Sequence, residues 1–222
     1  MDSSILFSLR LSFQVAFLAT LLATPLGILI AYLLAMKNFR GKGALDAFFT
    51  LPLVLPPVVV GYYLIVLFGK NGIIGKFLYE ATGWSIMFTW YAAVLASFFV
   101  AFPLMVKTTK AAIEAVDKNL VDASYTLGHT EWDTALKVIL PLAKRGIIAG
   151  SILTFARALG EFGATLMFAG NIPGKTNTVP LAIFTYMTSG QYTKAHIMAV
   201  LFTLISAISL YMANKYGGSA IR

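Results

Sequence analysis

Five stretches of the sequence are long and apolar enough to cross a membrane as helices, and they restrict the possible folds more than any other feature. Their approximate ranges are 11–36, 44–68, 85–106, 147–169 and 195–213. A stretch of about 18 or more apolar residues is typical of a membrane-spanning helix, whereas the strands of a membrane barrel are shorter and alternate in polarity. Charged residues make up 12% of the 222 residues, about half of their share in soluble domains. We therefore predict an all-α membrane protein with about five transmembrane helices, folded as one domain over residues 1–222.

Lysine and arginine residues outside these stretches predict how the chain is oriented. If the N-terminus is outside, the cytoplasmic segments contain Lys37, Arg40, Lys42, Lys107, Lys110, Lys118, Lys137, Lys144, Arg145, Lys215 and Arg222. The outer segments then contain Arg10, Lys70, Lys76, Lys175 and Lys194. An excess of basic residues marks the cytoplasmic side of membrane proteins. We expect a multi-pass protein of the plasma (inner) membrane, in contact with lipid, with its N-terminus outside and its C-terminus in the cytoplasm.

Two apolar segments depart from a simple spanning helix. Pro52, Pro56 and Pro57 interrupt the second stretch, and because proline lacks a backbone donor they predict a kink or a break there. This break is either an ordinary proline kink or a functional hinge. The segment Val179–Met187 is apolar but too short to span, so it is expected to form a re-entrant or interfacial helix.

The segment 107–145 is the longest predicted cytoplasmic loop, and its pattern predicts two short helices. In the first, an apolar stripe recurs at helical spacing through Leu120, Val121, Ser124 and Leu127. Gly128 is expected to end this helix, and Thr130 is expected to cap the second helix, with Asp133 three residues later. Pro141 lies near the expected end of the second helix. The stripe requires a partner, which is either a separate protein or the membrane domain of the same chain.

No catalytic, metal or nucleic-acid site emerges from the residues. The stretch "GNIPGKT" has three residues between its glycines where a phosphate-binding loop has four, and "GKNGIIGKF" has Phe77 where that loop needs Ser or Thr. His129 and His196 have no further ligand at metal-binding spacing, and the chain contains no cysteine. Between Lys110 and Lys137 the chain has five acidic residues against three lysines, which opposes binding to phosphate backbones. We therefore do not expect an enzyme.

The central loop carries a specific resemblance. The stretch "DASYTLGHTEWDTALKVILP" resembles the signature of ABC importer permeases at Asp122, Ala123, Ser124, Gly128, Val138, Leu140 and Pro141. The resemblance implies the transmembrane domain of a type I ABC importer, in which these helices are coupling helices that dock into a separate ATPase. Leu127, beside Gly128, is included in the expected docking surface. A second copy of the permease, two ATPase subunits that bind ATP and magnesium, and an extracytoplasmic oxyanion-binding protein are the implied partners; no cofactor is expected in this chain.

A second resemblance concerns the substrate. The stretches "RALGEFGATLMFAGNIPGKTNTVPLAIF" and "LPLVLPPVVVGYYL" are similar to the molybdate permease group, which is close to the sulfate and thiosulfate permeases. This likeness implies import of molybdate by alternating access, with sulfate, thiosulfate and tungstate as alternatives. An anion channel or secondary transporter that needs no ATPase is the alternative of a different class. The outer lysines would suit a tetrahedral dianion. The alternative is that they are ordinary loop charges, which solvent and salt screen and which play no part in transport.

Arg157 and Glu161 place opposite charges inside the fourth apolar stretch. At a spacing of four residues they lie on one face of a helix and are able to pair, which offsets a cost of about 3 kcal/mol for each charge at mid-membrane. Gly160 and Gly163 flank Glu161 and would allow another helix to approach closely. The pair is either a structural contact between protein surfaces or a part of the anion pathway.

Overall fold

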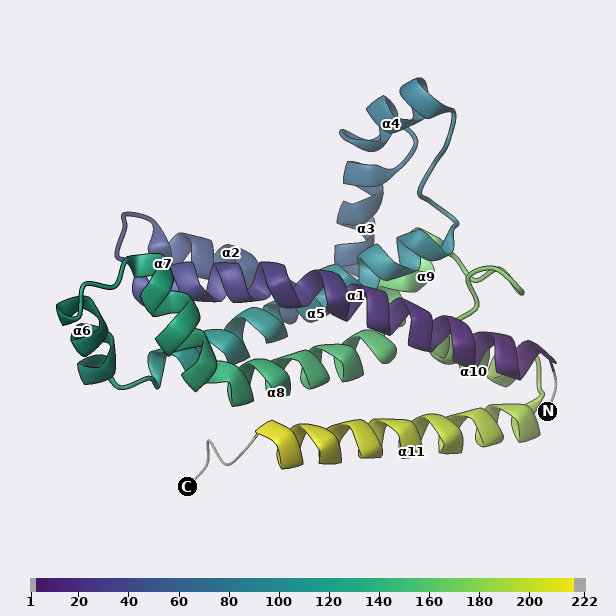
Figure 1. Ribbon diagram of the computed structural model, residues 1–222. Helices are drawn as coiled ribbons and strands as arrows, with labels where there is room; N and C mark the ends of the chain where they lie inside the picture. The colour runs from purple at the N-terminus through teal and green to yellow at the C-terminus, as the bar shows by residue number, and fades with distance from the viewer. Residues whose placement is uncertain (1–2, 218–222) are drawn as a thin grey trace.

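The computed structural model describes residues 3–217, and its regular elements there are all helices (Figure 1). Four long helices lie side by side and form the body: α1 (Ser3–Met36), α5 (Trp90–Glu114), α8 (Leu140–Leu159) and α11 (Tyr192–Gly217). α1, α5 and α8 pack against one another, and α11 lies against α8. The predicted all-α class is confirmed. Arg222, one of the predicted cytoplasmic charges, lies outside the described residues.

The number of spans agrees with the prediction. Four helices in the described chain are long and apolar enough to cross a membrane, and a bent pair of helices makes a fifth if it is counted as one span. The contacts between α1 and α5 are formed by small side chains such as Ala16, Ala19, Ala93 and Ala96, which are fully buried. Small residues allow membrane helices to approach closely, and dispersion contacts between them then stabilise the bundle.

The second span is broken, as its prolines predict. α2 (Lys42–Val54) and α3 (Pro57–Phe68) meet at an angle of 115°. Leu55 and Pro56 are extended at the break, because a residue that precedes proline is disfavoured in the helical region. α3 and the short helix α4 (Gly75–Thr82) consequently project from the body as an arm (Figure 1).

The third span differs from its predicted range of 85–106. α5 begins at Trp90, where Thr89 caps it by accepting a hydrogen bond from the backbone N–H of Ala92. At the other end it continues to Glu114, eight residues into the segment that was predicted as a loop. Hydropathy alone missed this extension because Lys107 and Lys110 are polar. Both of them bind Asp46 of α2, at 2.8 and 2.9 Å.

The prediction of a short second loop helix, and of a continuous fourth span over 147–169, is wrong. α7 (Glu131–Thr134) leads through a π-helical turn (Ala135–Ile139) directly into α8, giving one helix over Glu131–Leu159. Pro141 lies inside this helix rather than at an end. Proline removes a backbone donor and crowds the preceding turn, and the wider π turn accommodates it.

The fourth span then breaks at residues 160–162, and a short helix, α9 (Gly163–Ala169), follows. α10 (Val179–Thr188) has 10 residues and confirms the prediction of a short apolar helix. It packs between α1 and α11 at one end of the body, and the backbone N–H of Val179 donates to the Ser12 hydroxyl at 2.7 Å. α6 (Lys118–Thr126) and α7 lie at the opposite end (Figure 1).

Candidate functional site

The predicted coupling segment contains a short helix, α6, with defined ends. The Asp117 carboxylate caps its start by accepting from the backbone N–H of Asn119 at 2.9 Å. At its end Gly128 has a φ of +82°, its N–H donates to the carbonyl of Tyr125, and the N–H of His129 donates to the carbonyl of Ser124. This pair of bonds is a Schellman motif, so the prediction that Gly128 ends the helix is confirmed.

Two contacts hold α6 against the body. Val121 is buried in a cluster with Ile113 of α5 and Ile139 of the π turn. The hydroxyl groups of Ser124 and Thr134 form a buried hydrogen bond of 2.9 Å, which joins α6 to α7. A buried hydroxyl without a partner is costly, so this bond fixes the position of α6.

The apolar stripe predicted for α6 is divided between two faces. Val121 and Ser124 point inward, whereas Leu127 is 79% exposed and Leu120 is also exposed. Asp122 and Ala123 lie on the exposed side as well. The division arises because α6 is a short helix packed against the body by one side only. The outward residues thus remain available to a partner.

Trp132 and Leu136 extend this exposed surface onto α7 and the π turn. Trp132 is 69% exposed, and Leu136 is exposed beside it. Sequence reasoning missed both, although their spacing of four residues on a helix was a usable signal. We call Leu120, Leu127, Trp132 and Leu136 the apolar docking face. Exposed apolar clusters of this kind mark interaction sites.

The other predicted coupling residues lie apart from this face. Val138 and Leu140 are half-buried in the π turn and the first turn of α8, and Pro141 is exposed on α8. They therefore belong to the joint between α7 and α8. Glu131 anchors the start of this helix to α1, because its carboxylate accepts from the Tyr32 hydroxyl at 3.1 Å and from Lys37 at 2.6 Å.

Arg157 and Glu161 pair as predicted, but not on one helix. The Arg157 guanidinium lies 2.9 Å from the Glu161 carboxylate, and α8 ends at Leu159 between them. The Glu161 side chain is 1% exposed and that of Arg157 is 32% exposed. The second carboxylate oxygen of Glu161 accepts from the backbone N–H of Ala164 at 2.8 Å. Glu161 therefore joins the end of α8 to the start of α9.

The broken spans meet beside this pair. A Cβ atom added to Gly163 would lie 3.2 Å from the Cβ atom of Pro57, and one added to Gly61 would lie 3.0 Å from the Cα atom of Ala164. α3 and α9 thus touch through glycines, as the sequence predicts for Gly163. Gly160 instead is exposed at the end of α8. The first turns of two half-helices therefore come together next to Glu161.

A polar network fixes the loop between α9 and α10. The Ser8 hydroxyl donates to Asn177 at 2.8 Å, Asn177 donates to Asn171, and Asn171 donates to the Thr185 hydroxyl at 2.7 Å.

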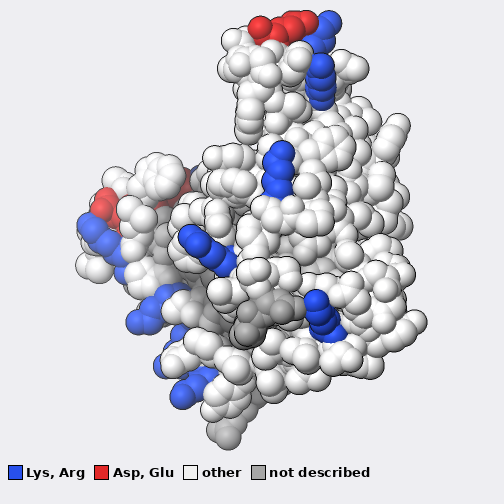
Figure 2. Space-filling view, turned by 90° about the vertical axis from the view of Figure 1, so that its right-hand side faces the viewer, with Lys and Arg blue, Asp and Glu red and all other residues white. Residues whose placement is uncertain are grey.

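Figure 2 shows this end of the molecule as mostly uncharged, with separate basic side chains. The acidic and basic atoms at the top of this view belong to the tip of the arm, where Lys76 and Glu80 lie 3.8 Å apart.

No group of three or more metal-ligating side chains forms within residues 3–217. The two groups of predicted residues lie near opposite ends of the helix Glu131–Leu159. The apolar docking face lies near its start and the charged pair lies at its end, and these 29 residues span about 44 Å at the rise of an α-helix.

The chain belongs to the family of binding-protein-dependent transport system inner membrane components, which matches residues 23–216. It is 44% identical over 208 residues to the molybdenum transport system permease protein ModB of Haemophilus influenzae, covering 93% of this chain and 91% of the relative. For the ModB protein of Escherichia coli K12 the identity is 46% over 205 residues, covering 92% and 90%.

Two further comparisons concern a sulfate permease and a solved transporter structure. The chain is 34% identical over 206 residues to a probable sulfate transport system permease protein, cysT, of Chlorella vulgaris, covering 93% of this chain and 77% of the relative. Its fold is similar to a chain of the inward-facing MetNI methionine ABC transporter, with a TM-score of 0.77 at 17% identity, covering 100% of this chain and 98% of the other. The expected fold, the transmembrane domain of an ABC importer, is thereby confirmed.

Proposed function

We propose that this chain is the permease subunit of an ATP-driven importer that moves molybdate across the plasma (inner) membrane. The observation that carries the proposal is an identity of 44–46% to molybdenum permeases over more than nine-tenths of the chain. The sulfate permease relative is less similar, at 34%, and is covered over a smaller share. Sulfate, thiosulfate and tungstate remain the alternative substrates.

The partners are a second copy of this chain, two ATPase subunits and an extracytoplasmic oxyanion-binding protein. The family description itself names dependence on a binding protein. The apolar docking face supports an ATPase partner, because Leu127 at the end of α6 and Trp132 of α7 expose apolar surface, and the bond between Ser124 and Thr134 joins these two helices. ATP and magnesium bind to that ATPase, so hydrolysis takes place outside this chain.

Transport follows an alternating-access cycle. Closure of the ATPases around ATP draws the two α6 helices together, and the helix Glu131–Leu159 carries this movement to the breaks beside α3 and α9. The paired permeases then open outward and accept the anion from the binding protein. Hydrolysis resets the ATPases, and the pathway opens inward. Rigid-body movement of packed elements is an established way of transmitting such a change.

The charged pair lies beside this pathway. Arg157 is partly exposed, so its guanidinium is able to attract a dianion, whereas the buried Glu161 holds that attraction in check. A pathway that bound its anion tightly would release it slowly. The N-terminus lies outside and the C-terminus lies in the cytoplasm, which places α6 and its basic neighbours on the side of the ATPase.

Competition for uptake tests the substrate. Proteoliposomes that contain the chain, its ATPase and its binding protein should take up labelled molybdate, and a tenfold excess of unlabelled sulfate should reduce uptake by less than about twofold. Unlabelled molybdate is the matched control and should remove most of the signal. Sulfate that competes as well as molybdate would contradict the proposed substrate.

A further inference from the structure

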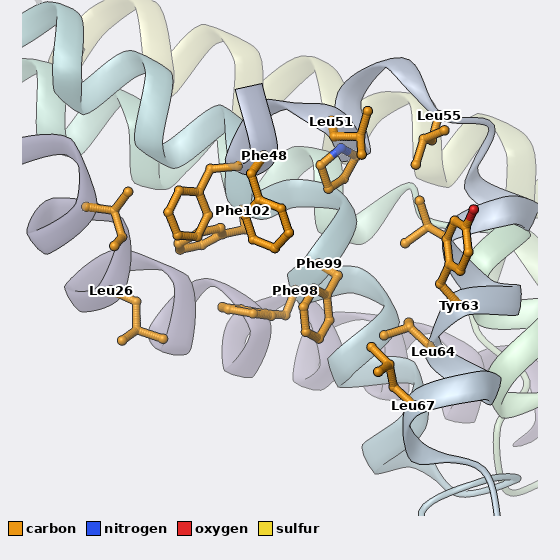
Figure 3. A pocket seen from close by; sticks show the side chains of 14 residues that line it. Leu26, Phe48, Leu51, Leu55, Tyr63, Leu64, Leu67, Phe98, Phe99 and Phe102 are labelled. Atoms are coloured by element: carbon orange, nitrogen blue, oxygen red, sulfur yellow. The ribbon is translucent and has the colours of Figure 1, made fainter. Parts of the chain in front are cut away.

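The bend between α2 and α3 opens an apolar groove on the side of the body. The groove has a volume of about 430 Å³, and α1, α2, α3 and α5 supply its walls. Figure 3 shows aromatic rings along it, among them Phe48, Phe98, Phe99 and Phe102. The hydroxyl group of Tyr63 is the one polar side-chain group among the lining residues. The groove therefore suits a long apolar ligand.

The groove lies at the bend between α2 and α3, where the two helices meet at 115°. Leu51 of α2, Leu55 at the break and Leu26 of α1 line the groove (Figure 3). Phe48 is 66% exposed at this wall, and Leu51 is also exposed. The surface is open in the single chain, and an apolar occupant would cover it.

Charged residues lie beyond one end of the groove. Asp46 lies one turn before Phe49 on α2, and Lys107 lies five residues after Phe102 on α5. The Asp46 carboxylate binds both Lys107 and Lys110, and Glu114 lies 3.9 Å from Lys110.

Two further cations stand at the start of α2. Arg40 and Lys42 form no ion pair with a carboxylate within residues 3–217, and Arg40 is exposed. The four cations at this end thus exceed the two carboxylates, and the excess is positive. An occupant that matches the whole site is apolar along the groove and anionic at the basic end.

We propose that this groove binds one anionic phospholipid of the membrane, with an acyl chain along the aromatic wall and the headgroup at Arg40 and Lys42, since Lys107 already pairs with Asp46. Basic residues beside a membrane attract anionic lipids, and an acyl chain gains free energy for every methylene that it buries. In the proposed orientation the basic end faces the cytoplasmic leaflet. A lipid bound there would support the 115° bend that α3 requires to meet α9.

Native mass spectrometry of the full chain in detergent tests this binding. The probes are palmitoyl-oleoyl phosphatidylglycerol and the phosphatidylcholine with the same acyl chains. We expect one phosphatidylglycerol molecule per chain, bound at least about fivefold more tightly than phosphatidylcholine, which corresponds to one cation contact. The double variant Arg40→Gln/Lys42→Gln should bind the two lipids equally, with helix content unchanged. Equal binding by the wild-type chain would overturn the proposal, as would a preference that survives in the double variant.

Two further variants separate the groove from the headgroup site. Leu51→Trp should fill the groove and weaken both lipids at least about fivefold, and Leu26→Trp serves the same purpose from the opposite wall. Lys76→Gln, on the exposed tip of the arm, is the matched charge control and should leave binding unchanged. Because the chain has no cysteine, Leu51→Cys reports on a second copy. A disulfide or bismaleimide link between two copies at this position would show that protein covers the groove and would overturn the proposal.

Discussion

The Arg157 guanidinium and the Glu161 carboxylate lie 2.9 Å apart across the end of a helix, with Glu161 buried and Arg157 partly exposed. This asymmetry predicts that the two residues differ in their effect on stability. Arg157→Gln leaves a buried carboxylate without its cation and should cost about 3 kcal/mol. Glu161→Gln keeps an acceptor for the N–H of Ala164 and should cost about 1 kcal/mol. Denaturant unfolding of the full chain in detergent, followed by helix content, measures both.

The milder of these two substitutions also tests transport. Because Glu161→Gln should retain the fold, a role of the pair in the pathway predicts that molybdate uptake falls at least about tenfold while the complex still assembles. Unaltered uptake with unaltered assembly would leave the pair a structural role alone. Equal destabilisation by the two substitutions would contradict the burial argument itself.

The contact between α3 and α9 gives a second prediction. In Gly61→Ala the new Cβ atom would lie 3.0 Å from the Cα atom of Ala164 and closer still to Met167, so α3 must move away from α9. Overpacking of this kind costs about 1–3 kcal/mol, and uptake should fall with it. Gly43→Ala is the matched control because its Cβ atom meets nothing within 4 Å. A melting temperature of Gly61→Ala equal to that of Gly43→Ala would refute the close contact.

The docking face predicts how the ATPase is held. Leu127→Asp places a charge on a surface whose burial would contribute about 2 kcal/mol, so co-purification of the ATPase should fall at least about tenfold. Asn119→Asp adds the same charge to the exposed first turn of α6 and is the control. Gly128→Pro should also abolish docking, because proline cannot adopt a φ of +82°. If Leu127→Asp or Gly128→Pro retained the ATPase at wild-type yield, with the membrane domain folded, the apolar docking face would not be the ATPase contact.

Much of this architecture follows from the sequence, for reasons that particular residues make clear. Hydropathy identifies the spans, and Pro56 and Pro57 predict the broken helix because the effect of proline on its neighbours is local. Gly128 predicts the end of α6, and Thr130 predicts the start of α7, where its side chain accepts from the backbone N–H of Asp133, for the same reason. Local signals of this kind operate within a few residues and need no knowledge of the rest of the fold.

Features that depend on distant contacts were not predictable in the same way. Lys107 and Lys110 look like loop residues until Asp46 pairs with them and allows α5 to extend. The spacing of Arg157 and Glu161 predicts their pairing, yet it does not reveal that α8 ends between them. The inward turn of Ser124 likewise depends on Thr134, which is ten residues away. The ends of α5 and α8, and the side of α6 that faces the body, therefore could not be read from local sequence signals.

The orientation of the chain is testable because the sequence has no cysteine. A single cysteine at Ser3 should react with a membrane-impermeant maleimide in right-side-out vesicles, whereas one at Asn119 should react only after the membrane is opened. Both positions are exposed, so labelling reports the side of the membrane rather than burial. The reverse pattern would place α6 outside and would exclude its contact with a cytoplasmic ATPase.

The most direct test of the central claim is uptake of labelled molybdate into proteoliposomes that contain this chain and the binding protein, with and without the cognate ATPase. The proposed mechanism predicts accumulation that requires both the ATPase and ATP, and that Leu127→Asp abolishes in the complete system. Uptake at the same rate by the chain without its ATPase would contradict the importer and would favour a channel or a secondary transporter.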